Sequence, residues 1–162
     1  MSTLNSRIAA LVPNMLGWCS VQKANDLALA VIKSRSTVTV EIGVFGGRSV
    51  LPMALAHAEQ KHGVVWCIDP WSADASIEGY DKANAEWWGN VNHEEVYQNF
   101  MGFVRTQGVE DYVKVIRDRS DYVEPPEKIF VLHLDGQHTD QTVRDVDRFA
   151  SRVVPGGYVF ID

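Results

Sequence analysis

Five acidic residues follow apolar stretches of this chain at intervals, and each has a side chain that can bind a polar ligand or a cation. They are Glu41, Asp69, Asp118, Asp135 and Asp162. Carboxylates accept hydrogen bonds from hydroxyl and amino groups, and they coordinate hard cations. A single acid at such a place is commonly the N-cap of the next helix. Five of them in equivalent places instead predict a binding site.

The segment 38–49 combines an apolar run, an acid and a glycine-rich turn. Its glycines are Gly43, Gly46 and Gly47, and their backbone is bare enough for a ligand to touch it. Their spacing does not match the G-x-G-x-x-G of a dinucleotide site, which counts against NAD. Glu41 needs a partner, and a cationic or hydroxyl-bearing cofactor would supply one. The segment therefore predicts an enzyme that acts on small molecules.

Hydrophobic periodicity predicts the elements that carry these residues. Helices are expected at 4–16, shortened by Pro13, and at 21–33, after an N-cap at Ser20. A helix over 139–152 is expected to bury Val143, Val146 and Phe149. Strands are expected at 38–43, 64–69, 112–116, 129–135 and 157–162, with a further helix at 49–61.

Val- and Ile-rich strands that alternate with helices predict a parallel sheet covered on both faces. Ligands bind such sheets beyond the carboxyl ends of the strands, which is where all five acids fall. The sequence therefore places the site at one edge of an α/β sheet.

Residues 72–108 interrupt the alternation with a polar loop that contains Trp87 and Trp88, followed by a helix at about 92–107. Long insertions at a ligand edge are often lids, which is the function we expect here. The alternative is that both tryptophans pin the insert to the core. Glu78, Asp81 and Glu86 in this insert are expected to be solvated.

The length of 162 residues suits one domain, and the formal net charge of −6 argues against a nucleic-acid surface. We see neither a membrane span nor a signal peptide, so a cytoplasmic protein without a membrane partner is expected. Cys19 and Cys67 form no C-x-x-C motif, and Cys67 is expected to be a core thiol. His57, His62 and His93 are expected on surfaces without a role. His133 is expected to pack between sheet and helix, short of the ligand edge.

Several motifs in order resemble the class I S-adenosylmethionine-dependent methyltransferases. The first are Glu41-x-Gly43-x-x-x-Gly47 and the Asp69-Pro70-Trp71 that ends the second strand. The carboxyl half adds Leu134-Asp135-Gly136-Gln137-His138, Val143-x-x-x-Asp147 and the stretch 155–162, Pro-Gly-Gly-Tyr-Val-Phe-Ile-Asp. They resemble the branch with small-molecule O-methyltransferases and cephalosporin-hydroxylase-like proteins. The resemblance covers residues 38–162, apart from most of the insert.

This resemblance implies a Rossmann-like three-layer α/β/α sandwich with a mostly parallel sheet and S-adenosylmethionine as cofactor. Asp69 would accept hydrogen bonds from both ribose hydroxyls, and Glu41 would anchor the glycine turn. Trp71 would lie against the adenine or, equally, in the core, and Ser120 would frame the adenine or cap a helix. The implied cofactor-binding residues are Glu41, Gly43, Phe45, Gly47, Ser49, Asp69, Trp71, Asp118, Ser120 and Asp135.

Asp135 and His138 carry the implied chemistry. A histidine near the cofactor's methyl group can act as general base toward a hydroxyl nucleophile, although His138 could instead cap the following helix. In the metal-using relatives, Mg²⁺ lowers the pKa of the hydroxyl group, and Asp135 and Asp162 match the positions of its acidic ligands. Two carboxylates make a sparse magnesium site, so metal-free catalysis stays equally open.

The expected organisation is a pair of N-terminal helices (1–36) followed by a cofactor-binding domain (37–162) with the insert at 72–108. The sequence ends at the tip of the fifth strand, whereas the family fold continues with another helix and an antiparallel strand pair. The edge of the sheet would then be exposed unless another chain, such as a second copy of this one, covers it. The expected function is methyl transfer to a small-molecule hydroxyl. The alternatives are an inactive cofactor-binding module, another enzyme on the same scaffold and a purely structural domain.

Overall fold

A computed structural model describes residues 3–79, 81–137 and 139–162 of the chain. At its centre lies a sheet with the strand order β3-β2-β1-β4-β5, in which every neighbouring pair is parallel. The strands are β1 (Val38–Ile42), β2 (Val64–Ile68), β3 (Val113–Ile116), β4 (Ile129–Leu134) and β5 (Val153–Ile161). The predicted α/β class and parallel sheet are confirmed.

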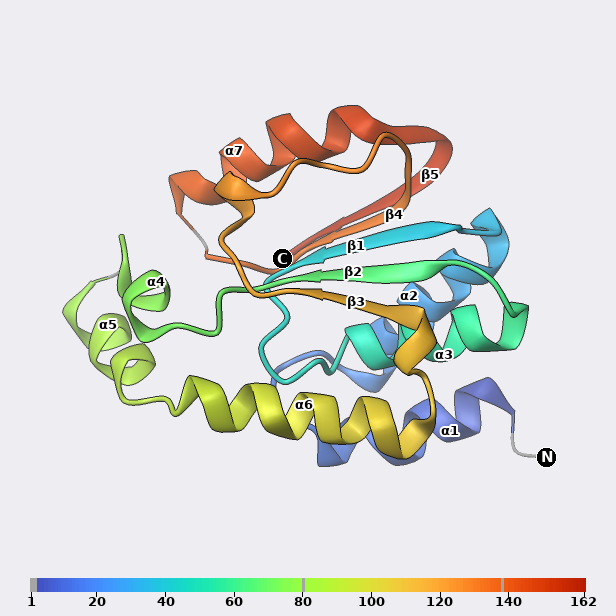
Figure 1. Cartoon of the computed structure of the whole chain (residues 1–162), viewed down its shortest axis with the longest axis horizontal. Coiled ribbons are helices and arrows are strands. Elements are labelled where there is room, and N and C mark those ends of the chain that lie inside the picture. The colour runs from blue at the N-terminus through green and yellow to red at the C-terminus, as the bar shows by residue number, and fades with distance from the viewer. Residues whose placement is uncertain (1–2, 80, 138) are drawn as a thin grey trace.

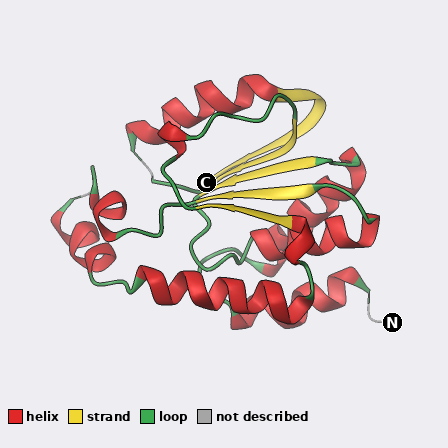
Figure 2. Ribbon diagram, in the orientation of Figure 1, coloured by secondary structure: helices red, strands yellow, loops and turns green. Residues whose placement is uncertain are grey.

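Helices cover both faces of the sheet, which makes the predicted three layers (Figures 1 and 2). One face carries α1 (Leu4–Leu11), α2 (Val21–Ser34), α3 (Val50–Gln60) and α6 (His93–Gln107). The other face carries α7 (Asp140–Phe149). Short 3₁₀ turns follow α1 and α7 and flank β3. Pro13 lies in the turn after α1, and the hydroxyl of Ser20 caps α2, both as predicted.

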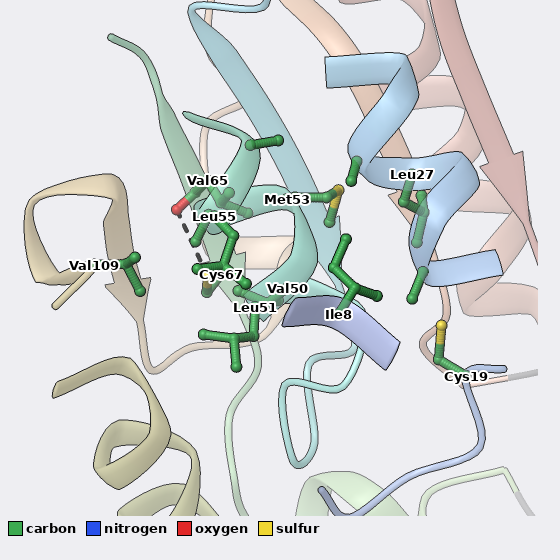
Figure 3. Packing of buried hydrophobic residues seen from close by; sticks show 14 of the residues in the cluster. Ile8, Cys19, Leu27, Val50, Leu51, Met53, Leu55, Val65, Cys67 and Val109 are labelled. Atoms are coloured by element: carbon green, nitrogen blue, oxygen red, sulfur yellow. Dashed lines mark hydrogen bonds between the residues drawn. The ribbon is translucent and has the colours of Figure 1, made fainter. Parts of the chain in front are cut away.

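The two faces of each strand feed two hydrophobic cores, because successive side chains of a strand point to opposite faces. Val65, Cys67 and Val131 pack toward α2 and α3. Val40, Ile42, Ile68 and Leu132 pack toward Phe149 of α7. Figure 3 shows the larger core, with side chains of the helical layer packed around Cys67. Both cysteines are buried free thiols, so Cys67 is the core thiol that the sequence predicted.

The insert differs from its prediction, because the expected polar loop contains two helices. These are α4 (Ala73–Ile77) and α5 (Lys82–Gly89), which precede the expected α6. Asp81 caps α5 by accepting hydrogen bonds from the backbone N–H groups of Ala83 and Asn84. Both short helices lie beyond the carboxyl ends of the strands (Figure 1).

The prediction for α7 was partly wrong. Phe149 is fully buried as expected, but Val143 is 62% exposed. The buried face of this helix is formed by Gln141, Asp145 and Phe149, which recur every four residues. The amino-terminal part of that face is therefore polar.

The strand β5 forms one edge of the sheet and contains an irregularity. The pairing with β4 passes from Ile129↔Val153 to Val131↔Tyr158, so the segment from Val154 to Gly157 bulges out of register. Beyond the bulge, Tyr158, Val159 and Ile161 are exposed. Among the described residues, no helix is both long and apolar enough to cross a bilayer.

Candidate functional site

A cavity lies at the carboxyl edge of the sheet, where the sequence predicted a binding site. The glycine turn after β1 and the ends of β2 and β4 line it, together with Ala75, Ser76 and Trp88 of the insert. Its polar lining consists of Arg48, Ser49, Ser76, Asp69, His93, Arg119, Ser120, Asp135, Gln137, Gln141 and Asp145. Residues from Leu16 to Asp145 therefore meet there.

Asp69 fixes the shape of the glycine turn. One carboxylate oxygen accepts hydrogen bonds from the backbone N–H groups of Val44 and Phe45, both at 2.9 Å. The other oxygen accepts from the N–H of Trp71 at 2.7 Å. Desolvation raises the pKa of Asp69 above its ordinary value, and these three N–H donors oppose the rise. Asp69 also borders the cavity, and its two oxygens offer about four acceptor sites, of which these N–H groups use three.

The turn itself leaves no room for side chains at its glycines. A Cβ on Gly43 (φ +84°) would lie 2.2 Å from the carbonyl oxygen of Asp135. A Cβ on Gly47 (φ +75°) would lie 2.1 Å from the ring of Phe100. Phe45 and Trp71 also have positive φ, which costs of order 1–3 kcal/mol for each such residue. The indole N–H of Trp71 donates to the carbonyl of Phe45 at 2.9 Å, which ties these two strained residues together.

One wall of the cavity carries a guanidinium group with a free donor. Arg48 donates from Nη1 to the carbonyl of Gly17 at 2.5 Å. Its Nε is buried and has no hydrogen-bond partner among the described residues. Arg48 borders the cavity, so its guanidinium group adds a positive charge to the lining.

Another wall of the cavity is a polar network between α7 and the turn after β3. The amide nitrogen of Gln141 lies 2.8 Å from a carboxylate oxygen of Asp121 and 3.0 Å from one of Asp145. Desolvation raises the pKa of Asp145, and hydrogen bonds from Ser120 and Gln141 oppose this rise. This wall therefore carries both hydrogen-bond donors and acceptors.

A buried chain of hydrogen bonds runs behind the glycine turn. The hydroxyl of Ser49 donates to one oxygen of Glu41, and the other oxygen lies 3.0 Å from Nδ1 of His133. Glu41 and His133 are register partners on adjacent strands, and neither is exposed at all. The second ring nitrogen of His133, Nε2, has no hydrogen-bond partner among the described residues and lies 3.7 Å from Asp162.

The thiol of Cys19 lies close to two of the acids at this end of the sheet. Burial, together with the charges of Glu41 and Asp135, raises the pKa of the nearby Cys19 thiol to about 11. The thiol therefore stays protonated at neutral pH, which excludes a thiolate nucleophile. The negative charges of Glu41 and Asp135 would attract a cation, and the positive charges of Lys23 and Arg48 oppose them.

Aromatic side chains gather at the mouth of the cavity. The ring of Trp18 stacks on Phe45 with the centroids 5.6 Å apart, and Trp88 meets Phe45 edge-on at 5.5 Å. Trp87 contacts both tryptophans, at 5.6 Å from Trp18 and 4.8 Å from Trp88. Trp18 is 72% exposed, so much of its surface faces solvent. The tryptophans of the insert therefore contact the rim of the cavity.

The structure brings most of the predicted site residues together. Gly43, Phe45, Ser49, Asp69, Ser120 and Asp135 border the cavity. Glu41 and Gly47 are not among the described residues that border it. Trp71 packs against Phe100 in the core, with the rings 5.9 Å apart, and Asp118 is exposed outside the cavity. Asp162 lies at the end of β5 near Asp135, and His138 falls outside the described residues.

Sequence reasoning missed or misplaced other members of this region. Arg48, Gln141 and Asp145 line the cavity, and no role was predicted for them. His57 and His93, expected on the surface, are both buried. His133, expected short of the ligand edge, reaches Asp162 there. A signal existed for His57, because the preceding residues 50–56 have no polar face and indicate a helix buried all round.

The sequence model of a family described as "Methyltransferase domain" matches residues 40–162. No curated protein matches the chain. Among solved structures, the O-methyltransferase NovP superposes with a TM-score of 0.66 at 22% identity, over 87% of this chain and 63% of that one. The methyltransferase PaMTH1 of Podospora anserina, with S-adenosylhomocysteine bound, gives a TM-score of 0.65 at 12% identity, over 100% and 62% of the two chains.

TomG of Streptomyces achromogenes is an O-methyltransferase of tomaymycin synthesis, solved with S-adenosylmethionine. It superposes with a TM-score of 0.60 at 16% identity, over 100% of this chain and 66% of that one. At these identities the likeness establishes a shared fold. The chain spans between 62% and 66% of the length of these three proteins.

Proposed function

Since this chain belongs to the methyltransferase-domain family, among the class I S-adenosylmethionine-dependent enzymes, we propose that it transfers a methyl group to a hydroxyl of a small molecule. The observation that carries the proposal is the cavity between the glycine turn and the polar wall of α7. Its lining suits each part of the cofactor. Arg48 would bind the methionine carboxylate, Asp69 the ribose hydroxyls, and Ser120 with Gln141 the adenine.

When bound, the cofactor supplies an electrophilic methyl group on a positively charged sulfur. Asp135 borders the cavity and adds negative potential, which favours that charge. We propose His138 as the general base that takes the proton of the acceptor hydroxyl. Replacing His138 with Ala should leave cofactor affinity near normal and slow turnover by about 10²-fold or more.

The aromatic rim supports a planar acceptor. Trp18, Phe45 and Trp88 border the cavity, and their stacked and edge-on rings offer a flat face to an aromatic ring. Such pairs contribute ~0.5–1.5 kcal/mol beyond the area that they bury. A phenolic hydroxyl is therefore the acceptor that we propose to test first.

Two measurements test this function. Calorimetric titration with S-adenosylhomocysteine should give micromolar binding, and an assay with labelled S-adenosylmethionine and a panel of phenols should give a methylated product. Failure of binding by a demonstrably folded chain would contradict the proposal. Binding without methyl transfer, at any metal concentration, would instead support the alternative of an inactive cofactor-binding module.

Magnesium assistance is a finer part of the same proposal. Asp135 and Asp162 end adjacent strands and would supply oxygen ligands, and a bound cation would lower the pKa of the acceptor hydroxyl. The ion pair between Lys23 and Asp162 competes for one of these ligands. Magnesium dependence of turnover, measured after treatment with a chelator, decides whether such assistance exists.

A further inference from the structure

A third potential metal ligand lies beside the two acids at the end of the sheet. Ligand atoms of His133, Asp135 and Asp162 all lie within 4.8 Å of one another. The three residues come from the ends of β4 and β5, two adjacent strands whose register is fixed by their pairing. The arrangement is therefore held by the sheet itself.

The hydrogen bonds of His133 prepare one ring nitrogen for coordination. Glu41 lies 3.0 Å from Nδ1, and Ser49 in turn donates to Glu41. Because a carboxylate in this place accepts a hydrogen bond from Nδ1–H, Nε2 is the ring nitrogen that is left to bind a metal ion. Metal-ligating histidines almost always donate their other N–H to such a group.

The Nε2 atom is the unusual feature of the region. His133 is fully buried, yet among the described residues Nε2 has no hydrogen-bond partner. Leaving a buried polar atom unsatisfied costs ~1–3 kcal/mol, and such an atom calls for an explanation. A carboxylate oxygen of Asp162 lies 3.7 Å from it, a spacing that a bridging ion could span.

We infer, on the basis of the function proposed above, that His133 joins Asp135 and Asp162 as ligand of a divalent transition-metal ion. One imidazole and two carboxylates form a mixed nitrogen–oxygen donor set. Mg²⁺ prefers oxygen ligands, whereas imidazole favours first-row transition metals. The site therefore selects an ion such as Mn²⁺ over Mg²⁺ and holds it beside the cavity.

Lys23 is the resident competitor of that ion. It forms an ion pair with the same Asp162 oxygen that faces His133. Metal binding replaces this ammonium group, so its removal strengthens metal binding. Lys23→Met should raise the affinity for Mn²⁺ by about three- to fivefold, the range expected when a partly exposed ion pair is lost.

The test uses Mn²⁺ and Mg²⁺ as probes on the whole chain, without cofactor or acceptor. Calorimetry should give an affinity for Mn²⁺ at least tenfold higher than for Mg²⁺. Pulsed electron paramagnetic resonance of bound Mn²⁺ should show coupling to a directly bound ¹⁴N nucleus. Equal affinities, absence of nitrogen coupling, or no Mn²⁺ binding at millimolar concentration would each overturn the inference.

His133→Asn is the decisive variant, since its amide nitrogen can still donate to Glu41 while the Nε2 ligand is lost. It should lose the nitrogen coupling and weaken Mn²⁺ binding by about 100-fold. Loss of a residue that only orients a ligand already weakens metal binding by about 10- to 100-fold, and loss of a ligand itself should cost at least as much. The matched control is His57→Asn. His57 is also buried, but its hydrogen bonds go to Thr39 and His62. This variant should therefore retain both the nitrogen coupling and the affinity for Mn²⁺. Coupling that persists in His133→Asn would overturn the assignment.

If His133→Asn does not fold, Asp162→Asn replaces it, because this side chain is 37% exposed. It should weaken Mn²⁺ binding with the fold intact, and unchanged binding would contradict the site. Titration of the same samples with S-adenosylhomocysteine separates the two proposals. Cofactor binding without metal binding refutes only the metal site, whereas metal binding without cofactor binding refutes only the proposed function.

Discussion

A histidine is buried at each end of the sheet, and the two histidines, His57 and His133, differ in their hydrogen bonds. At the amino end, His57 of α3 uses both ring nitrogens, with Nε2 at 3.0 Å from the hydroxyl of Thr39 and Nδ1 at 3.0 Å from the carbonyl of His62. At the carboxyl end, His133 uses only Nδ1. A histidine whose two ring nitrogens both have hydrogen-bond partners stabilises the fold, whereas one with an unpaired ring nitrogen can bind a ligand.

The surroundings of the two histidines follow the same division. His57 lies among neutral partners, because Thr39 in turn bonds the hydroxyl of Ser36 at 3.1 Å. His133 lies among Glu41, Asp135 and Asp162. The amino end therefore gains stability from a closed network, and the carboxyl end retains charge that a cation can use.

The largest effect is expected when the partner of His133 is removed. Glu41→Leu leaves the His133 N–H and the Ser49 hydroxyl without an acceptor, so the free energy of unfolding should fall by about 3–5 kcal/mol. Urea unfolding followed by tryptophan fluorescence measures this. Glu59→Leu, an exposed position on α3, is the control and should stay within about 0.5 kcal/mol of the parent. A loss below 1 kcal/mol for Glu41→Leu would show that the buried pair is not formed.

The second effect is a pH dependence that arises at the amino end. Burial lowers the pKa of His57 from 6.5 to about 4. As the pH falls below 6.5, His57 binds a proton in the unfolded chain but not in the folded chain. The free energy of unfolding therefore declines until about pH 4. This contribution amounts to about 3 kcal/mol.

His57→Asn removes that titration. Between pH 7 and pH 4, the variant should therefore lose about 3 kcal/mol less stability than the parent does. Urea unfolding at a series of pH values compares the two slopes. Identical slopes would mean that His57 is protonated in the folded chain, and the contrast between the two ends would then fail.

Several features of the fold could be predicted because their signals are local. The strands show as Val- and Ile-rich runs, the turn shows as three glycines, and the cap at Ser20 lies next to its helix. The two helices of the insert were missed because they are short and lack an apolar face. Asp81, a favourable N-cap residue, could nevertheless have indicated the start of α5.

The features that sequence reasoning missed depend on pairing between distant segments. His133 faces Glu41 only because β1 and β4 adopt one particular register, which periodicity does not reveal. The prediction that Val143 is buried was wrong for a related reason. The buried face of α7 begins with Gln141 and Asp145, so the apolar residues of this helix do not mark the side that faces the sheet.

The third effect tests the role of Asp69 at the carboxyl end. Asp69→Ala should weaken the binding of S-adenosylhomocysteine by ~1.5–3 kcal/mol, the range for loss of a charge-assisted hydrogen bond. Calorimetry with the 2′-deoxy ligand separates two causes. If Asp69 binds the ribose, the variant should lose less affinity for this ligand. Equal losses would mean that Asp69 acts only by holding the N–H groups of Val44 and Phe45.

The smallest effect is expected from the partner of His57. Thr39→Val keeps the shape of the side chain and removes the hydroxyl between Ser36 and His57. Because these partners are uncharged, the free energy of unfolding should fall by only about 1–2 kcal/mol. Thr37→Val, at an exposed position, is the control and should be nearly neutral. A loss for Thr39→Val as large as that for Glu41→Leu would mean that charge does not distinguish the two ends, since both networks would then depend equally on their hydrogen bonds.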